Sequence, residues 1–429
     1  MNLLVQSNTQ HPARNTQLNI SGSKSETNRL LLLQALFPNI QLENTSNSDD
    51  SEVMTKALNS NDEVLDIHHA GTAMRFLTAY FSIQEGREVV LTGSQRMQER
   101  PIKILVDALK QLGAQITYEK NDGYPPIRIK GEKITKNQVT LQANVSSQYI
   151  SALLLIASKL ENGIELTLEG EITSIPYIQM TLALLNEIGI KTQFEGNIIK
   201  VESQKSKVEI NIQHPTPNTQ HLTVESDWSS ASYHYSIVAL SPVGTQITLS
   251  SYKSNSLQGD SELANIYKSF GVETTFDNNQ IHLKKQSTII SDPKPNTQHP
   301  TPNTFDLTKT PDIAQTIAVT CFGLGIGCHL TGLHTLKIKE TDRLEALRVE
   351  LSKLGAAISV TDVDLTLQPR TQIHSNITIA TYNDHRMAMA FAPLALLVPI
   401  QIQNAEVVSK SYPQFWSDLK QLGFSILEQ

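Results

Sequence analysis

A short pattern of apolar and polar residues recurs several times along this chain. An amphipathic run at helical spacing reaches an apolar residue and then a glycine, and a β-prone run follows within a few residues. The five clear copies are ALKQLGAQI, LLNEIGIKT, IYKSFGVET, LSKLGAAIS and LKQLGFSIL, centred on Gly113, Gly189, Gly271, Gly355 and Gly423. Each copy predicts a helix that ends on a left-handed glycine and leads into a strand.

A weaker sixth copy, VMTKALNSNDEVL, follows Val53 and has Asn and Ser where the glycine would stand. Six copies of a unit this long predict a repeated α/β subdomain rather than a solenoid. Because glycine-terminated helices are common, an accidental repeat is the alternative.

Basic residues gather at the predicted starts of helices. In SGSKSETNRL, Ser23 and Glu26 have capping-box spacing, which predicts a helix start. Free N–H groups and the positive end of the helix dipole favour an anion there. In HAGTAMRF, Gly71 and Thr72 predict a tight turn into a second helix. Pro101 in QERPIKI fits the first position of a third helix.

The same theme continues to the end of the chain. NVSSQYIS and SIPYIQM offer hydroxyl groups at helix starts, and KTPDIAQ, KETDRLEAL, NDHRMAM and SKSYPQF combine acids with bases. The bases at these boundaries are Lys24, Arg29, Arg75, Arg100, Lys339, Arg343, Arg386 and Lys410. Their convergence predicts a ligand with more than one anionic group, since Arg suits carboxylates and phosphates. Taken singly, each motif also fits an ordinary capped surface helix.

Composition narrows the class of protein. The 429 residues are enough for two or three domains, and 39% hydrophobic with 18% charged residues is typical of a soluble globular protein. No run approaches the length of a membrane span, and the N-terminus lacks the features of a signal peptide. We therefore expect a cytoplasmic protein with no membrane partner. The net charge of −7 argues against general nucleic-acid binding. Cys321 and Cys328 lie in an apolar run, which favours buried free thiols.

Three polar cassettes rich in Pro and Asn share the letters NTQ, at residues 7–18, 212–222 and 295–305. Such segments disfavour regular structure and are interpreted as surface loops. They carry several of the 12 histidines. A metal site is the alternative, but the histidines lack ligand spacing, so no metal is predicted.

The motifs, taken in order, resemble those of the EPSP synthase (3-phosphoshikimate 1-carboxyvinyltransferase) family of enolpyruvyl transferases. The strings that carry the resemblance are GSKSxxNR, AGTAMR, RMxERP, SSQ, PYI, SDxSSASY, PD, KETDR, NDHRMAM and SKSYPxF, from Ser21 to the end. The resemblance implies an α/β fold of two similar lobes, each of three βαβαββ units around buried helices. The lobes would comprise residues 1–19 with 226–429 and residues 20–225, with the active site in the cleft between them.

The resemblance also implies the reaction and its residues. An enolpyruvyl group would pass from phosphoenolpyruvate to the 5-hydroxyl of shikimate 3-phosphate, by addition and then loss of phosphate. The reaction would belong to the shikimate pathway and would need no cofactor. Catalytic roles are implied for Asp312, Glu340, Lys24 and Lys410. Shikimate 3-phosphate would contact Lys24, Ser25, Arg29, Ser146, Ser147, Gln148, Ser174, Tyr177, Asp312, Thr335 and Lys339. Phosphoenolpyruvate would contact Lys24, Gly71, Arg100, Gln148, Arg343, Arg386 and Lys410. We expect a monomer that glyphosate inhibits.

Some residues depart from the pattern of the family. His69, Phe76 and Thr335 stand where members often have Asn, Pro and Asn, which puts one shikimate contact in doubt at Thr335. Two other functions stay open. The first is that of a related enolpyruvyl transferase, which acts on UDP-N-acetylglucosamine. That enzyme uses a cysteine on a mobile loop, whereas both cysteines of this chain lie in an apolar run. A non-catalytic binder of phosphorylated metabolites would not need the acids and bases that this chain keeps.

Overall fold

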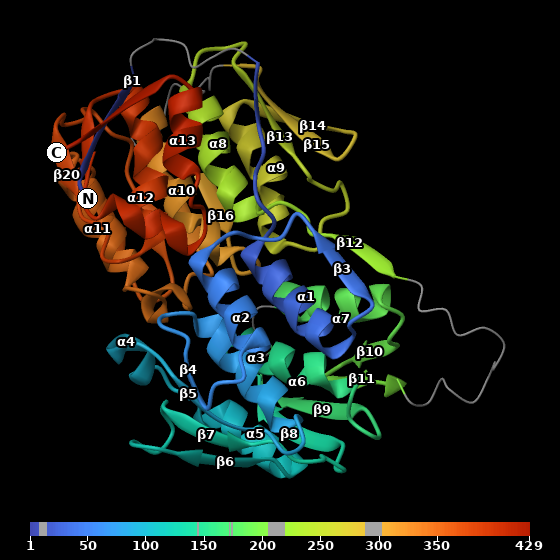
Figure 1. Cartoon of the computed structure of the whole chain (residues 1–429). Coiled ribbons are helices and arrows are strands. Elements are labelled where there is room, and N and C mark those ends of the chain that lie inside the picture. The colour runs from blue at the N-terminus through green and yellow to red at the C-terminus, as the bar shows by residue number, and fades with distance from the viewer. Residues whose placement is uncertain (8–14, 144–145, 171, 173–174, 205–218, 288–302) are drawn as a thin grey trace. The chain divides into compact units, whose positions relative to one another are not determined.

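The computed structural model describes residues 1–7, 15–143, 146–170, 172, 175–204, 219–287 and 303–429. The chain divides into two compact units. The terminal unit comprises Met1–Ser21 and Glu225–Gln429, and the inserted unit comprises Gly22–Val224. The sequence placed the two crossings near residues 20 and 225, within two residues of this division. Figure 1 labels the elements of both units.

Each unit contains three small sheets among its described residues. In the inserted unit these are β4-β5-β7-β6, β8-β9-β11-β10 and the two-stranded β3-β12. The strands are β3 (Ile40–Glu43), β4 (Val64–Asp66), β5 (Glu88–Thr92), β6 (Gln115–Tyr118), β7 (Ile127–Lys130), β8 (Gln138–Gln142), β9 (Ile164–Glu169), β10 (Thr192–Glu195), β11 (Ile198–Val201) and β12 (Gln220–Thr223). The helices are α1 (Lys24–Leu36), α2 (Asp49–Asn59), α3 (Gly71–Ser82), α4 (Gln95–Gln98), α5 (Lys103–Leu112), α6 (Ser147–Ala157) and α7 (Ile175–Glu187).

The terminal unit has the sheets β2-β13-β15-β14, β16-β17-β19-β18 and β20-β21-β1-β22. The strands are β1 (Leu3–Ser7), β2 (Thr16–Leu18), β13 (Gln246–Ser250), β14 (Val272–Asp277), β15 (Gln280–Lys285), β16 (Asn303–Asp306), β17 (Cys328–Thr331), β18 (Ile358–Val360), β19 (Leu365–Leu367), β20 (Ile377–Ile379), β21 (Ile400–Ile402) and β22 (Phe424–Glu428). The helices are α8 (Trp228–Leu240), α9 (Leu263–Ile266), α10 (Ala314–Leu324), α11 (Arg343–Lys353), α12 (His385–Phe391) and α13 (Phe415–Gln421).

All five four-stranded sheets share one pairing pattern, in which a parallel pair is followed by two antiparallel pairings. In each sheet the outermost antiparallel strand follows one of the five repeated glycines. Every one of those glycines has a positive φ, between 74° and 111°. The five helix–glycine–strand predictions are therefore confirmed.

The prediction that the weak sixth copy belongs to this series is wrong. Helix α2 is followed by Ser60, which has an extended backbone with φ −86° rather than a left-handed one. The strand that follows, β4, pairs in parallel with β5 and so begins a sheet. A helix that feeds the parallel part of a sheet does not need the sharp reversal that a left-handed cap provides.

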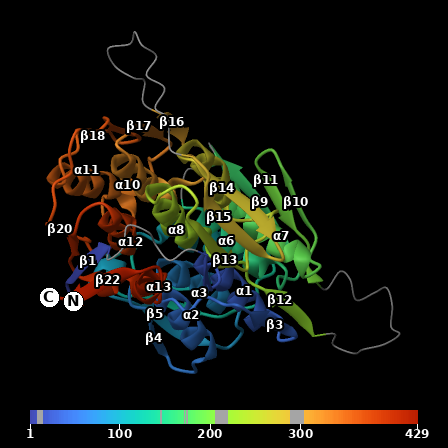
Figure 2. The ribbon, with the colours of Figure 1, turned by 90° about the horizontal axis from the view of Figure 1, so that it is seen from above.

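The N-terminal strand completes a sheet whose other strands come from the C-terminus. Strand β1 pairs antiparallel with both β21 and β22, and both ribbon views show the N- and C-terminal strands side by side (Figures 1 and 2). The inserted unit likewise interrupts a sheet, because β2 and β13 pair in parallel on either side of it in sequence. Through these pairings, the terminal unit is built from both ends of the chain.

Several helices are enclosed by these sheets. Ten of the 11 residues of α6 and ten of the 11 residues of α10 are buried. A helix that is apolar on all sides is a core helix, and its termini are then the parts available to a ligand. Among the described residues, no helix is both long and apolar enough to span a membrane.

Candidate functional site

In the inserted unit, cationic and polar side chains lie at the first residues of several helices. Lys24 is the first residue of α1, and its Nζ lies 3.4 Å from Oδ2 of Asp50, the second residue of α2. The other oxygen of Asp50 lies 3.9 Å from Nε2 of His69, just before α3. One carboxylate thus links the starts of three helices. Asp50 was not predicted as a site residue, because in the sequence it looks like any acidic residue in the first turn of a helix.

The capping box predicted at Ser23 is wrong, although the helix does begin at Lys24. Ser23 makes no side-chain cap hydrogen bond, and its main-chain oxygen instead accepts from the N–H of Thr27 at 2.8 Å. The first-turn N–H groups of α1 are therefore not used by this hydroxyl, and such N–H groups are suited to bind an anion.

Gly71 and Arg100 are brought into direct contact. A Cβ atom added to Gly71 would lie 2.6 Å from Nη1 and 2.9 Å from Nη2 of Arg100. The guanidinium group of Arg100 therefore fills the space that a side chain at residue 71 would take. It lies against the N-terminal turn of α3, where the helix dipole is positive. Two residues assigned to phosphoenolpyruvate on sequence grounds are thus neighbours.

The start of α6 lies beside the start of α3. Nε2 of Gln148 donates to Oγ1 of Thr72 at 3.1 Å, which joins the second residues of the two helices. Ser146 caps α6 through its hydroxyl, which accepts from the N–H of Gln148 at 3.4 Å. Ser147 is buried. Because these two helix starts are in contact, the positive ends of their dipoles lie at one place, which suits one anionic ligand.

Arg75 does not fit the expectation that it faces an anion. Its side chain is buried, and its guanidinium donates to the main-chain oxygens of Gly71, at 3.1 Å, and Pro101, at 3.2 Å. Tyr149 donates to the same oxygen of Pro101 at 2.7 Å. Burial, aided by the charge of Arg100, lowers the pKa of Arg75 to about 10. Arg75 therefore holds the segment that carries Arg100.

The helix position predicted for Pro101 is also wrong, since α5 begins two residues later at Lys103. The short helix α4 takes up the preceding turn, and Arg96 pairs there with Glu99 on the surface. Ser174 lies outside the described residues.

Arg29 and Tyr177 lie together, deeper than the first turn of α1. Nε of Arg29 donates to Oγ1 of Thr181 at 2.8 Å, and Nη2 donates to Oγ of Ser151 at 3.0 Å. Nη1 donates to the main-chain oxygen of Ser25 at 2.8 Å. Burial lowers the pKa of Arg29 to about 10. Tyr177 and Glu26 act against this shift, and the groups that accept hydrogen bonds from the guanidinium group are neutral.

The terminal unit carries a second cluster, centred on Asp312. This residue lies in the short 3-10 turn Pro311–Ile313 that leads into α10. Oδ1 of Asp312 lies 2.8 Å from Nη1 of Arg343 and 3.5 Å from Nζ of Lys339, and Oδ2 lies 3.4 Å from Nη2 of Arg386. Three of the predicted site residues therefore meet one predicted catalytic acid.

Arg343 is the buried centre of this cluster, with 2% of its side chain exposed. Nε donates to Oδ2 of Asp384 at 2.6 Å, and Nη2 donates to Oε2 of Glu340 at 2.7 Å. Burial alone would lower the pKa of Arg343, but Asp384, Glu340 and Asp312 outweigh it and raise that pKa. Arg343 is the first residue of α11, whose N-cap Asp342 accepts from the N–H of Glu345.

Two acidic residues of this cluster were not predicted from the sequence. Asp384 is fully buried and caps α12, since its Oδ1 accepts from the N–H of Arg386 at 2.9 Å. Its place just before a helix start was the available signal. Asp260 is buried, accepts from the hydroxyls of Ser229 and Thr310, and had no such signal. Burial, followed by the charge of Asp312, raises the pKa of Asp260.

Arg386 and Lys410 are held by main-chain oxygens as well. Nη1 of Arg386 donates to the oxygen of Asp312 at 3.0 Å, and Nζ of Lys410 donates to the oxygen of Asn383 at 2.7 Å. Burial opposes the charge of Arg386, but Asp312 outweighs it and raises the pKa of Arg386. Thr335, whose role the sequence left in doubt, has a buried Oγ1 without a hydrogen-bond partner among the described residues.

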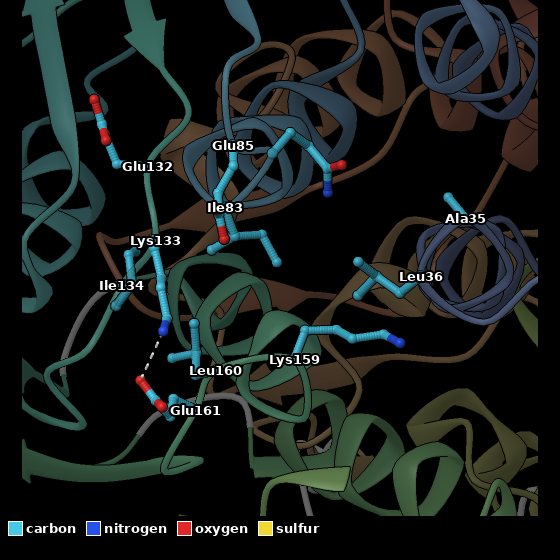
Figure 3. A pocket seen from close by; sticks show the side chains of 11 residues that line it. Ala35, Leu36, Ile83, Glu85, Glu132, Lys133, Ile134, Lys159, Leu160 and Glu161 are labelled. Atoms are coloured by element: carbon cyan, nitrogen blue, oxygen red, sulfur yellow. Dashed lines mark ion pairs between the residues drawn. The ribbon is translucent and has the colours of Figure 1, made fainter. Parts of the chain in front are cut away.

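A cavity of about 300 Å³ in the inserted unit lies away from these residues. Its lining comes from the C-terminal ends of α1, α3 and α6 with the segments that follow them, including Leu36, Ile83 and Leu160, and from residues 132–134 between β7 and β8 (Figure 3). Helix C-termini are partly negative, and Glu85, Glu132 and Glu161 add carboxylates. Lys133 and Lys159 also line the cavity, and Nζ of Lys133 lies 3.4 Å from Oε2 of Glu161, so the lining carries both signs of charge. Within the described ranges there is no group of His, Cys, Asp and Glu that could hold a metal ion.

Comparison with known proteins decides the family. The family model described as "EPSP synthase (3-phosphoshikimate 1-carboxyvinyltransferase)" matches residues 41–419. A 3-phosphoshikimate 1-carboxyvinyltransferase of Bacteroides fragilis (strain YCH46) is 45% identical over 413 residues, which cover 95% of each chain. The chain belongs to the EPSP synthase family. Another relative of that name, from Actinobacillus pleuropneumoniae serotype 5b (strain L20), is 33% identical over 95% of this chain and 96% of its own.

Solved structures agree with this family at the level of the fold. EPSP synthase from Acinetobacter baumannii superposes with a TM-score of 0.78 at 20% identity, and all of both chains is covered. The enolpyruvyl transferase NikO from Streptomyces tendae gives a TM-score of 0.68 at 14% identity, with 100% and 99% coverage. The predicted α/β fold of the enolpyruvyl transferases is therefore confirmed.

Proposed function

We propose that this chain transfers the enolpyruvyl group of phosphoenolpyruvate to the 5-hydroxyl of shikimate 3-phosphate and releases phosphate. Membership of the EPSP synthase family supports the reaction. The observation that carries the assignment to residues is the cluster in which Asp312 meets Arg343, Lys339 and Arg386. A carboxylate fixed by three cations is positioned for proton transfer among anionic substrates.

Asp312 is assigned as the base for the 5-hydroxyl. In the addition step, the hydroxyl oxygen bonds to C2 of phosphoenolpyruvate while a proton is delivered to C3. In the elimination step, a proton leaves C3 and the C2–O bond to phosphate breaks. Glu340 is assigned to the proton transfers at C3, with Lys24 or Lys410 as partner. Nη2 of Arg343 holds Oε2 of Glu340 at 2.7 Å, and this contact fixes the direction of the carboxylate.

The binding roles follow the two clusters. In the inserted unit, the helix starts at Lys24, Ser25 and Ser147, together with Arg29 and Tyr177, would hold shikimate 3-phosphate. Gly71, Arg100 and Gln148 would hold phosphoenolpyruvate, together with Arg343, Arg386 and Lys410 of the terminal unit. N–H groups at helix starts and guanidinium groups both bind phosphate and carboxylate oxygens.

The two other functions are less well supported. The two cysteines of the chain, Cys321 in α10 and Cys328 in β17, are both buried, so neither provides the loop cysteine of the UDP-sugar enzyme. A mere binder would not require Asp312, Glu340 and Lys410 together. Cytoplasmic location, a monomeric state and independence from cofactors stay predictions.

The test is phosphate release by the purified chain given both substrates, beside Asp312→Ala and Asp312→Asn. Release should require both substrates and fall by about 10²–10⁴ in either variant. Asp362→Ala is the matched control, since Asp362 pairs on the surface with Lys337 and has an exposed side chain. Binding of shikimate 3-phosphate without release by the wild type would indicate a binder, and neither binding nor release would overturn the proposed substrate.

A further inference from the structure

Phe76 is a buried residue of α3 whose ring lies against the charge of Arg29. The guanidinium carbon of Arg29 lies 5.4 Å from the centre of the Phe76 ring and 5.8 Å from the centre of the Tyr177 ring. Phe76 is fully buried and Arg29 is 2% exposed. The contact joins α1 to α3 in the interior of the inserted unit.

The aromatic faces stabilise Arg29 in a way that a carboxylate would not. An aromatic ring attracts a cation through its quadrupole but carries no net charge. Arg343 in the terminal unit shows the opposite arrangement, because three carboxylates surround it. Arg29 lies in a desolvated place, where burial lowers its pKa to about 10, and the nearby Tyr177 and Glu26 only partly offset that shift. A charge of this kind attracts an anionic ligand strongly.

The ring also leaves the hydrogen-bond donors of Arg29 in place. The guanidinium group has five N–H donors, and its bonds to Thr181, Ser151, Ser25 and the main-chain oxygen of Tyr177 use four of them. A ring packed on the guanidinium group restricts its rotation without using the fifth. The orientation of that last donor is then fixed jointly by the hydrogen bonds and by the ring.

We propose that Phe76 is a positioning residue for shikimate 3-phosphate, acting through Arg29. This inference rests on the proposed function, in which Arg29 contacts that substrate. Phe76 itself touches neither substrate.

The test measures binding of shikimate 3-phosphate by calorimetry, and the separate KM values, in Phe76→Leu. The expected result is a weakening of shikimate 3-phosphate binding by about 3- to 30-fold, the range that corresponds to a buried cation–π contact. KM for phosphoenolpyruvate and kcat should stay within about twofold. Phe81→Leu is the matched control, because Phe81 lies in the same helix, is 3% exposed and packs on Tyr80 instead.

Equal weakening in Phe81→Leu would mean that any loss of packing in α3 has this effect, and would overturn the proposal. Unchanged binding in Phe76→Leu would overturn it as well. Phe76→Met, which keeps most of the volume, replaces Phe76→Leu if the latter does not fold. The expected result for Phe76→Met is the same weakening.

A double-mutant cycle identifies the route of the effect. If Phe76 acts through Arg29, Phe76→Leu should weaken binding little further in an Arg29→Gln background. Full additivity of the two substitutions would overturn the proposal. Failure of the proposed function is a distinct outcome, since it would appear as absent turnover or absent binding in the wild type.

Discussion

Asp384 holds Arg343 in a fully buried ion pair, in which Nε of Arg343 donates to Oδ2 of Asp384 at 2.6 Å. The other oxygen of Asp384 caps α12 by accepting from the N–H of Arg386. One carboxylate thus sets the positions of two arginines that we assign to phosphoenolpyruvate. Removal of the Asp384 carboxylate would leave the buried charge of Arg343 with one ion-pair partner fewer.

We predict that Asp384→Asn impairs both stability and binding of phosphoenolpyruvate. An asparagine cannot accept at both positions, so either the contact to Arg343 or the cap of α12 is lost. Breaking a buried ion pair costs about 3–5 kcal/mol of unfolding free energy, and KM for phosphoenolpyruvate should rise at least about tenfold. Denaturant unfolding and steady-state kinetics measure the two effects.

Asp342→Asn is the control for this prediction, since Asp342 is the N-cap of the neighbouring helix α11. Asparagine caps helices about as well as aspartate, so both quantities should change little. Wild-type kinetics in Asp384→Asn would contradict the role given to Asp384.

Gly71→Ala should weaken binding of phosphoenolpyruvate by displacing Arg100. The new Cβ would lie 2.6 Å from Nη1 of Arg100, which is too close for the guanidinium group to stay where it is. Loss of one charged hydrogen bond corresponds to about 10-fold or more in KM for phosphoenolpyruvate. KM for shikimate 3-phosphate, measured in the same assay, should stay unchanged. A rise in both KM values would indicate wider disruption.

Glyphosate should inhibit the wild-type enzyme in competition with phosphoenolpyruvate, as its family predicts. The same displacement of Arg100 should make Gly71→Ala less sensitive to it than the wild type. Inhibition curves at several concentrations of phosphoenolpyruvate test both statements. Uninhibited turnover of the wild type at millimolar glyphosate would refute the first.

His234 should make the protein less stable in acid. Burial lowers the pKa of His234 to about 3, while its Nε2 lies 3.0 Å from the hydroxyl of Tyr412. The unfolded chain, with a pKa near 6.5, binds a proton between about pH 6.5 and pH 3 that the folded chain does not bind. Stability is therefore lost as the pH falls through this window, by about 2 kcal/mol from pH 7.5 to pH 5.

His234→Gln tests this prediction, because a Gln amide can still donate to Tyr412 but does not titrate. The free energy of unfolding should fall less between pH 7.5 and pH 5 in the variant than in the wild type. The titration of the nearby Asp418 is common to both proteins and cancels in the comparison. His334→Gln, at an exposed position, is the control. Identical pH profiles for the wild type and His234→Gln would contradict the prediction.

The sequence predicted elements best where local physics decides them. The five helix–glycine–strand units were found because a left-handed backbone requires glycine at one fixed place in each. The starts of α1, α3 and α6 were found for a similar reason, since their motifs combine glycine and hydroxyl residues with a change of pattern. The sixth unit was wrong because α2 lacks that local requirement and leads into a parallel strand.

Side-chain roles were less predictable than elements. Arg75 and Arg100 are alike in sequence, as bases beside helix starts. In the structure, Arg75 is buried on main-chain oxygens, whereas Arg100 lies against Gly71. Only the packing of α3 against the segment at Pro101 distinguishes them.

By itself, the sequence determined the repeated α/β units, the helix starts that favour anions and, through its motifs, the resemblance to a family. Tertiary structure alone decided that β1 completes a sheet of C-terminal strands, and that three carboxylates surround Arg343. It also decided that Phe76 lies beneath Arg29. The physical reason is the separation along the chain of the residues that interact. Caps and turns depend on neighbours within a few residues, whereas strand pairing, ion pairs and ring contacts join residues that only the complete fold brings together.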